Sequence, residues 1–113
     1  MNVLWLQASG CGGCTMSLLC AEDPNVFDLL DGAGIKMLWH PAFSRASGAE
    51  VRSLLASILA GELVLDVLCV EGAIARGPRG TGRYHILSGT GVPMLQWVQD
   101  LAACAGHVVA VGT

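Results

Sequence analysis

Charged side chains are scarce in this sequence: Asp, Glu, Lys and Arg together make up 13% of its 113 residues. The six Lys and Arg residues, set against nine Asp and Glu, form no patch large enough to hold nucleic acid. No apolar run reaches the roughly 20 residues of a membrane-spanning helix, although hydrophobic residues make up 53% of the chain. We therefore expect no transmembrane segment, and an apolar surface that is partly covered by a partner protein.

A secretory signal is also missing, because the apolar run at 3–6 follows Met1 with no basic region and no twin arginine before it. This pattern predicts a cytoplasmic protein. The length fits a single domain, residues 1–113. Five cysteines form an odd set, which in a reducing compartment indicates metal or catalytic ligands and buried thiols, not a disulfide framework.

Short apolar runs alternate with stretches of helical periodicity along the chain. The runs are nearly continuous and rich in Val, Leu and Ile, which is typical of parallel strands covered on both faces. We expect strands at 3–7, 35–39, 65–70 and 107–111, and helices at 15–21, 24–31 (with Asp23 as N-cap), 49–60 and 93–105. This alternation predicts an α/β fold, a doubly wound parallel sheet with right-handed crossovers.

Three irregular segments each follow a predicted strand: residues 10–14, 40–48 and 72–92. They should therefore meet at the carboxyl edge of the sheet, where open α/β sheets bind their ligands. This convergence indicates a functional site at that edge.

The first of these segments holds the motif C-G-G-C, with Cys11 and Cys14. Structural zinc would need a second Cys/His pair, and none is evident. A redox dithiol at a helix start and half of an iron–sulfur ligand set both fit the local pattern, so the motif alone leaves a cluster, a dithiol and zinc open. The other cysteines, Cys20, Cys69 and Cys104, are interpreted as small buried hydrophobic side chains.

Glu71 is an acid at the end of an apolar strand. It could cap loop amides, or act as a partly buried acid that relays protons near the cysteine turn. The arginine-rich segment 76–83 does not have the Lys-Ser/Thr ending of a P-loop and is interpreted as a flexible, partner-facing loop. His40 and His85 should lie in loops at the same edge, and the three tryptophans (Trp5, Trp39 and Trp97) should pack in the core or at an interface.

Three motifs together resemble a known family: VLWLQASGCGGCTMSLL, LCVEGAIARGPRGTGRYH and MLQWVQDLAACAGHVVAVGT. In this order and spacing they are similar to the N-terminal, flavodoxin-like part of the small subunit of [NiFe] hydrogenases, of the cytosolic uptake or hydrogen-sensing type. The resemblance covers essentially the whole chain.

The resemblance implies that Cys11 and Cys14 bind a proximal [4Fe-4S] cluster that exchanges electrons with a nickel–iron centre in a partner large subunit. It also implies that Glu71 takes part in proton movement. The family's third cluster ligand would stand directly after Thr113, so we expect a truncated ligand set and a sheet that is incomplete on its C-terminal side. A downstream electron acceptor or a signalling partner would complete the system.

Two other classes remain as hypotheses. The chain could be a stand-alone thiol redox or metal-binding module that uses the Cys11/Cys14 pair, or a non-catalytic interaction domain.

Overall fold

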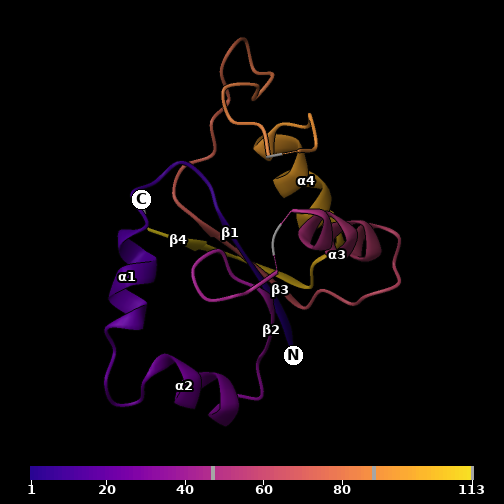
Figure 1. Cartoon of the computed structure of the whole chain (residues 1–113). Coiled ribbons are helices and arrows are strands. Elements are labelled where there is room, and N and C mark those ends of the chain that lie inside the picture. The colour runs from indigo at the N-terminus through magenta and orange to yellow at the C-terminus, as the bar shows by residue number, and fades with distance from the viewer. Residues whose placement is uncertain (47, 88, 113) are drawn as a thin grey trace.

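The computed structural model describes residues 1–46, 48–87 and 89–112. Within these ranges two helices separate the first two strands and one helix separates each later pair, in the order β1-α1-α2-β2-α3-β3-α4-β4 (Figure 1). Their bounds are Asn2–Gln7 (β1), Gly13–Leu19 (α1), Val26–Gly32 (α2), Lys36–Trp39 (β2), Ala49–Leu59 (α3), Val67–Glu71 (β3), Met94–Cys104 (α4) and His107–Val111 (β4).

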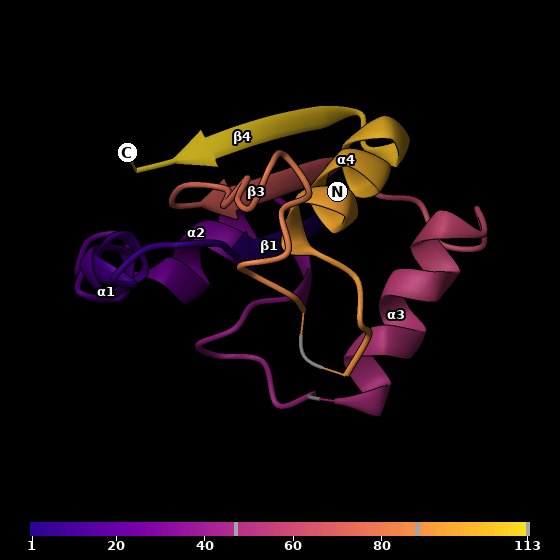
Figure 2. The same cartoon turned by 90° about the horizontal axis from the view of Figure 1, so that it is seen from above.

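The strands form one parallel sheet in the order β2-β1-β3-β4. β1 is central and pairs with β3 from Val3 opposite Val67 to Gln7 opposite Glu71. Helices lie on both faces of this sheet, as the view in Figure 2 shows. The predicted doubly wound α/β fold is therefore confirmed, and each predicted strand and helix overlaps an observed one.

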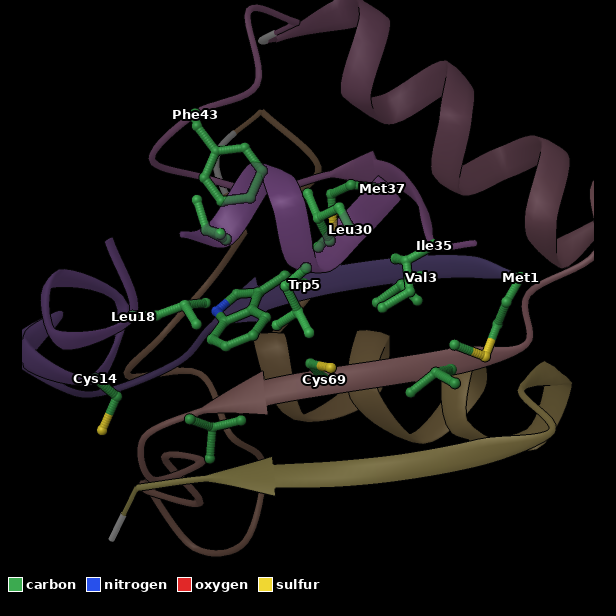
Figure 3. Close-up of a pocket in the computed structure, with 14 residues that line it drawn as sticks. Met1, Val3, Trp5, Cys14, Leu18, Leu30, Ile35, Met37, Phe43 and Cys69 are labelled. Atoms are coloured by element: carbon green, nitrogen blue, oxygen red, sulfur yellow. The ribbon is translucent and has the colours of Figure 1, made fainter. Parts of the chain in front are cut away.

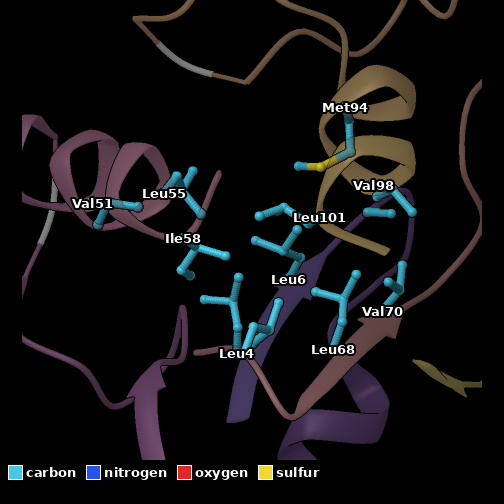
Figure 4. Close-up of a cluster of buried hydrophobic side chains, with 12 residues drawn as sticks. Leu4, Leu6, Val51, Leu55, Ile58, Leu68, Val70, Met94, Val98 and Leu101 are labelled. Carbon is cyan, nitrogen blue, oxygen red and sulfur yellow. The ribbon is translucent and has the colours of Figure 1, made fainter. Parts of the chain in front are cut away.

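The face covered by α3 and α4 holds the main core (Figure 4). Alternate residues of β1 and β3 point into it, including Leu4 and Leu68, which are both fully buried. Leu55 of α3 and Leu101 of α4 meet them at 0% exposure. The buried apolar residues of each helix lie three or four positions apart, so each helix presents one continuous apolar stripe to the sheet.

The opposite face, under α1 and α2, is packed more loosely. Its buried cluster consists of Val3, Trp5 and Cys69, with partly buried neighbours such as Leu18 of α1. An apolar cavity of about 410 Å³ lies between these strands and the two short helices (Figure 3). Apolar surface on this side is thus only partly removed from water.

Three expectations from the sequence are wrong in detail. β4 was expected to be covered on both faces, but among the described residues it is an edge strand that pairs with β3, and most of its residues are exposed. The N-cap of α2 is not Asp23 but Asn25, whose side chain accepts a hydrogen bond from the Asp28 amide at 2.9 Å. Cys20 and Cys104 are exposed, because each lies at a helix end and away from the core, whereas Cys69 is buried as expected.

None of the helices within the described ranges is long and apolar enough to span a membrane.

Candidate functional site

The segments after β1 and β3 are hydrogen-bonded to each other at the carboxyl edge of the sheet. Ser9 and Ala73 exchange two backbone hydrogen bonds, at 2.7 and 2.9 Å. Gly72 directly precedes Ala73 and has a φ of 87°, and a Cβ there would stand 2.7 Å from the Ser9 carbonyl oxygen. Only glycine fits this close approach, so the backbone holds the cysteine turn and the end of β3 together.

The cysteine turn joins β1 to α1. Gly12 is the N-cap of α1 in a left-handed conformation, with a φ of 77°, which glycine adopts without strain. The Gly13 amide donates a hydrogen bond to the Cys11 sulfur at 3.4 Å. Both Cys11 and Cys14 are exposed free thiols. The turn therefore presents two accessible sulfur atoms at the edge where the sequence predicted a site.

A pocket of about 250 Å³ opens between this turn, the end of β3 and the end of β4. Glycines make up most of its wall, so the backbone itself lines the space. A Cβ at Gly112, beyond β4, would lie 2.9 Å from the Cys14 sulfur. The lining residues are Gly10, Cys11, Gly12, Gly13, Cys14, Glu71, Gly72 and Gly112. The structure thus brings three segments far apart in sequence around the two thiols.

Glu71 is the buried acid of this pocket, with 2% of its surface exposed. One carboxylate oxygen accepts from the Thr15 amide at 2.6 Å, and the other accepts from the Thr15 hydroxyl at 3.1 Å. The carboxylate therefore caps a helix amide in the first turn of α1, where the sequence interpretation had expected loop amides, and fixes that turn against β3. Thr15 was not singled out from the sequence, although its hydroxyl directly after a ligand-like cysteine was a usable signal.

His40 directly follows β2 on the same side and is completely buried. Its ring stacks on Phe43, with centroids 4.0 Å apart, and lies 4.8 Å from Trp5. The Ala42 amide donates to His40 Nδ1 at 3.0 Å, so the neutral ring carries its proton on Nε2. Burial lowers the pKa of His40, and the nearby charge of Glu71 opposes this shift. The histidine is therefore a packed, neutral ring near Glu71.

His85 and the arginines of the 76–83 segment do not line the pocket, and the three tryptophans pack against the two apolar clusters as expected.

Cys11 and Cys14 are the two metal-ligand candidates that the structure brings together. In the part of the chain that the structure describes, no third His, Cys, Asp or Glu joins them in a metal-binding group. Burial raises the pKa of the Cys69 thiol, which lies on the sheet face and not at the pocket. Two accessible thiols beside a glycine-walled pocket fit two corners of an iron–sulfur cluster, since backbone without side chains leaves room for inorganic sulfide.

The fold and the cysteine turn define a flavodoxin-like α/β domain with a two-thiol site at the carboxyl edge of its sheet. The sequence matches the family described as NADH ubiquinone oxidoreductase, 20 kDa subunit, over residues 11–113, and the chain belongs to that family.

The curated relatives that this sequence matches are small subunits of hydrogenases. The chain is 28% identical to the F420 non-reducing hydrogenase II small subunit of Methanosarcina mazei, over 98% of its own length and 31% of the relative's. It is 33% identical to the periplasmic [NiFeSe] hydrogenase small subunit of Desulfomicrobium baculatum, over 98% of its length and 37% of the relative's. The chain thus spans about a third of the length of these relatives.

Solved structures agree with this relationship. The [NiFeSe] hydrogenase of Desulfomicrobium baculatum superposes with a TM-score of 0.78 at 32% identity, over 98% of this chain and 42% of that one. The actinobacterial-type NiFe-hydrogenase of Ralstonia eutropha gives 0.77 at 27% identity, over 97% and 35%. The chain is therefore homologous to the part of hydrogenase small subunits that carries this fold.

Proposed function

We propose that this chain is the electron-transfer part of a heterodimeric [NiFe] hydrogenase, with Cys11 and Cys14 as two ligands of a proximal [4Fe-4S] cluster. The observation that carries the proposal is the pair of exposed thiols at the glycine-walled pocket, in a chain related throughout to hydrogenase small subunits. A bound cluster would accept and release single electrons.

The reaction of the complex would be the reversible conversion of H₂ into two protons and two electrons, at a nickel–iron centre held by the large subunit. This chain's part is to hold the thiolates at the face that meets the partner. The same arrangement could serve an uptake enzyme that passes electrons to an acceptor, or a sensor that passes a signal to another protein. A cytoplasmic location stays a prediction.

Glu71 would act beside the cluster. Its carboxylate is held by two hydrogen bonds from Thr15, so its orientation toward the first turn of α1 is fixed. A buried carboxylate that is fixed in this way can take up and release a proton at one place. We assign it proton transfer at the pocket.

The dithiol module is the second candidate, because Cys11 and Cys14 are free, exposed and at the start of a helix. The two functions differ in metal content. In the dithiol case the protein is colourless, and the pair cycles between thiol and disulfide.

Anaerobic purification of the protein with its large subunit tests the proposal. We expect iron and sulfide with a [4Fe-4S] absorption and spin-resonance signature, and loss of both after Cys14→Ala. Cys104→Ala is the matched control, since Cys104 is an exposed cysteine away from the pocket. An iron-free protein, or a Cys14→Ala variant with unchanged cluster and unchanged electron transfer from H₂, rules out Cys14 as a ligand.

Glu71→Gln tests the acid separately. It keeps the shape and an acceptor for the Thr15 amide but removes the exchangeable carboxyl proton. We expect slower H₂/D⁺ exchange with the cluster spectrum retained. An unchanged exchange rate would leave Glu71 with its capping role alone.

A further inference from the structure

Positive charge is concentrated in one segment of an otherwise acidic chain. Residues 72–99 contain Arg76, Arg79 and Arg83 and no Asp or Glu, whereas the rest of the chain has three basic and nine acidic residues. All three arginines are exposed. The flanking acids are engaged elsewhere, Glu71 with Thr15 and Asp100 with the Gln96 side chain. Nothing in the local sequence therefore offsets this charge.

Backbone hydrogen bonds close the segment 76–84, which we call the arginine loop. The Gly82 amide donates to the Arg76 carbonyl at 2.9 Å, and the Tyr84 amide donates to the Gly77 carbonyl at 3.0 Å. The Thr81 hydroxyl adds a bond to the Pro78 carbonyl at 2.6 Å. The loop was expected to be flexible, but these bonds hold its ends together and give it a defined shape.

Tyr84 is a strongly exposed aromatic side chain of the loop, with 79% of its surface accessible. Its ring lies over Gly77, where a Cβ would come within 2.6 Å of the ring. The glycine therefore leaves room for the ring on the loop. Arginine and tyrosine are, with tryptophan, enriched among the residues that contribute most to binding at protein interfaces.

The arginine loop projects from the body beyond α4 (Figure 1). The chain enters this excursion at Ala73, which is hydrogen-bonded to Ser9 next to the cysteine turn. A protein that covers the pocket of Cys11, Cys14 and Glu71 would therefore approach the edge from which the loop projects.

We propose that the arginine loop docks on an acidic surface of the large subunit; this rests on the function proposed above. Guanidinium groups bind carboxylates through paired hydrogen bonds, and exposed complementary charges mainly raise the association rate. The loop sets the orientation of the partner over the two-thiol pocket through contacts that the cluster site does not supply.

The test measures association of the cluster-loaded protein with the purified large subunit, under anaerobic conditions and at several salt concentrations. Arg83→Glu is compared with Lys36→Glu, which makes the same change of charge at the exposed first residue of β2, remote from the loop. We expect Arg83→Glu to slow association about tenfold at low salt and Lys36→Glu to change it less than twofold. Arg76→Glu/Arg83→Glu should slow it further, and all differences should shrink as salt rises.

The outcomes separate the docking proposal from the proposed function. If iron and large-subunit binding are intact but Arg83→Glu and Lys36→Glu bind alike, the docking proposal is wrong and the proposed function stands. If the unmodified, cluster-loaded protein does not bind the large subunit, both fail. If Arg83→Glu leaves that binding unchanged but slows electron delivery to an acidic acceptor protein, the loop belongs to the acceptor interface and the docking proposal is overturned. Equal circular dichroism and melting temperature for the variants exclude misfolding as the cause.

Discussion

The two faces of the sheet differ in how completely the described chain closes them. On the α3/α4 face, helices of eleven residues each bury a continuous cluster against β1 and β3. On the α1/α2 face, helices of seven residues each leave an apolar cavity of about 410 Å³ and a small buried cluster. The two faces also differ in their relation to the candidate site, because Glu71 and the two thiols lie beside α1 and not on the α3/α4 face.

This difference separates stability from function within one domain. The α3/α4 face fixes β1 and β3, and their ends position the cysteine turn. The α1/α2 face is joined to the sheet by a polar anchor, the Glu71–Thr15 pair, and by few apolar contacts. Regions with few buried contacts open at lower free energy than the core. We therefore expect the α1/α2 face to open first.

The largest effect should be the difference in free energy of unfolding between Leu101→Ala and Leu30→Ala. Both are leucines in helices, so the change in helix propensity is the same. Leu101 is fully buried in the α3/α4 cluster, and its loss should lower the free energy of unfolding by about 2–5 kcal/mol. Leu30 lies at the cavity wall, partly exposed, and should cost about 1 kcal/mol. Denaturant unfolding of both variants measures the difference, and equal losses would contradict the comparison.

A smaller effect should come from the pH dependence of stability. His40 belongs to the α1/α2 side through its contact with Trp5, and burial lowers its pKa from the ordinary 6.5. Between the lowered folded value and 6.5 the unfolded chain binds more protons, so stability rises with pH in that range. The contribution of His40 is complete above about pH 6.5 and is lost as the pH falls below it.

His40→Phe checks this assignment by denaturant unfolding between about pH 5 and 7. The variant keeps an aromatic ring for stacking on Phe43 but cannot be protonated. We expect its stability to vary less with pH in this range than that of the unmodified protein. His107→Gln, which removes an exposed histidine, is the control. A slope that persists in His40→Phe would assign it to other groups.

The sheet and its strands could be predicted from the sequence because their signal is local. Continuous apolar runs define buried parallel strands, and the run at 107–111 coincides with β4. The exposure of β4 could not be predicted, because the sequence of a strand does not say whether another strand or helix covers it. Cys20 and Cys104 show the same limit: their polarity suits a core, but their positions at helix ends expose them.

The candidate site was likewise only partly predictable from the sequence. Cys11, Cys14 and Glu71 were predicted to meet, because parallel strands end at one edge of a sheet. The Thr15 bonds to Glu71 and the complete burial of His40 depend on side-chain directions after a turn, which spacing does not give. The shape of the arginine loop likewise depends on hydrogen bonds between its own ends.

The smallest effect, and the most direct view of the weaker face, should be the labelling rate of its buried thiol. Cys69 is buried beside Trp5, and burial raises its pKa, so it should react with iodoacetamide only when the α1/α2 face opens. We expect labelling at least about tenfold slower than at exposed Cys104, yet faster than global unfolding allows. Mass spectrometry of a Cys11→Ser/Cys14→Ser protein follows both thiols without interference from the site. Labelling of Cys69 at the rate of Cys104 would mean that the face is already open. Labelling only at the global unfolding rate would mean that it is closed as firmly as the α3/α4 face.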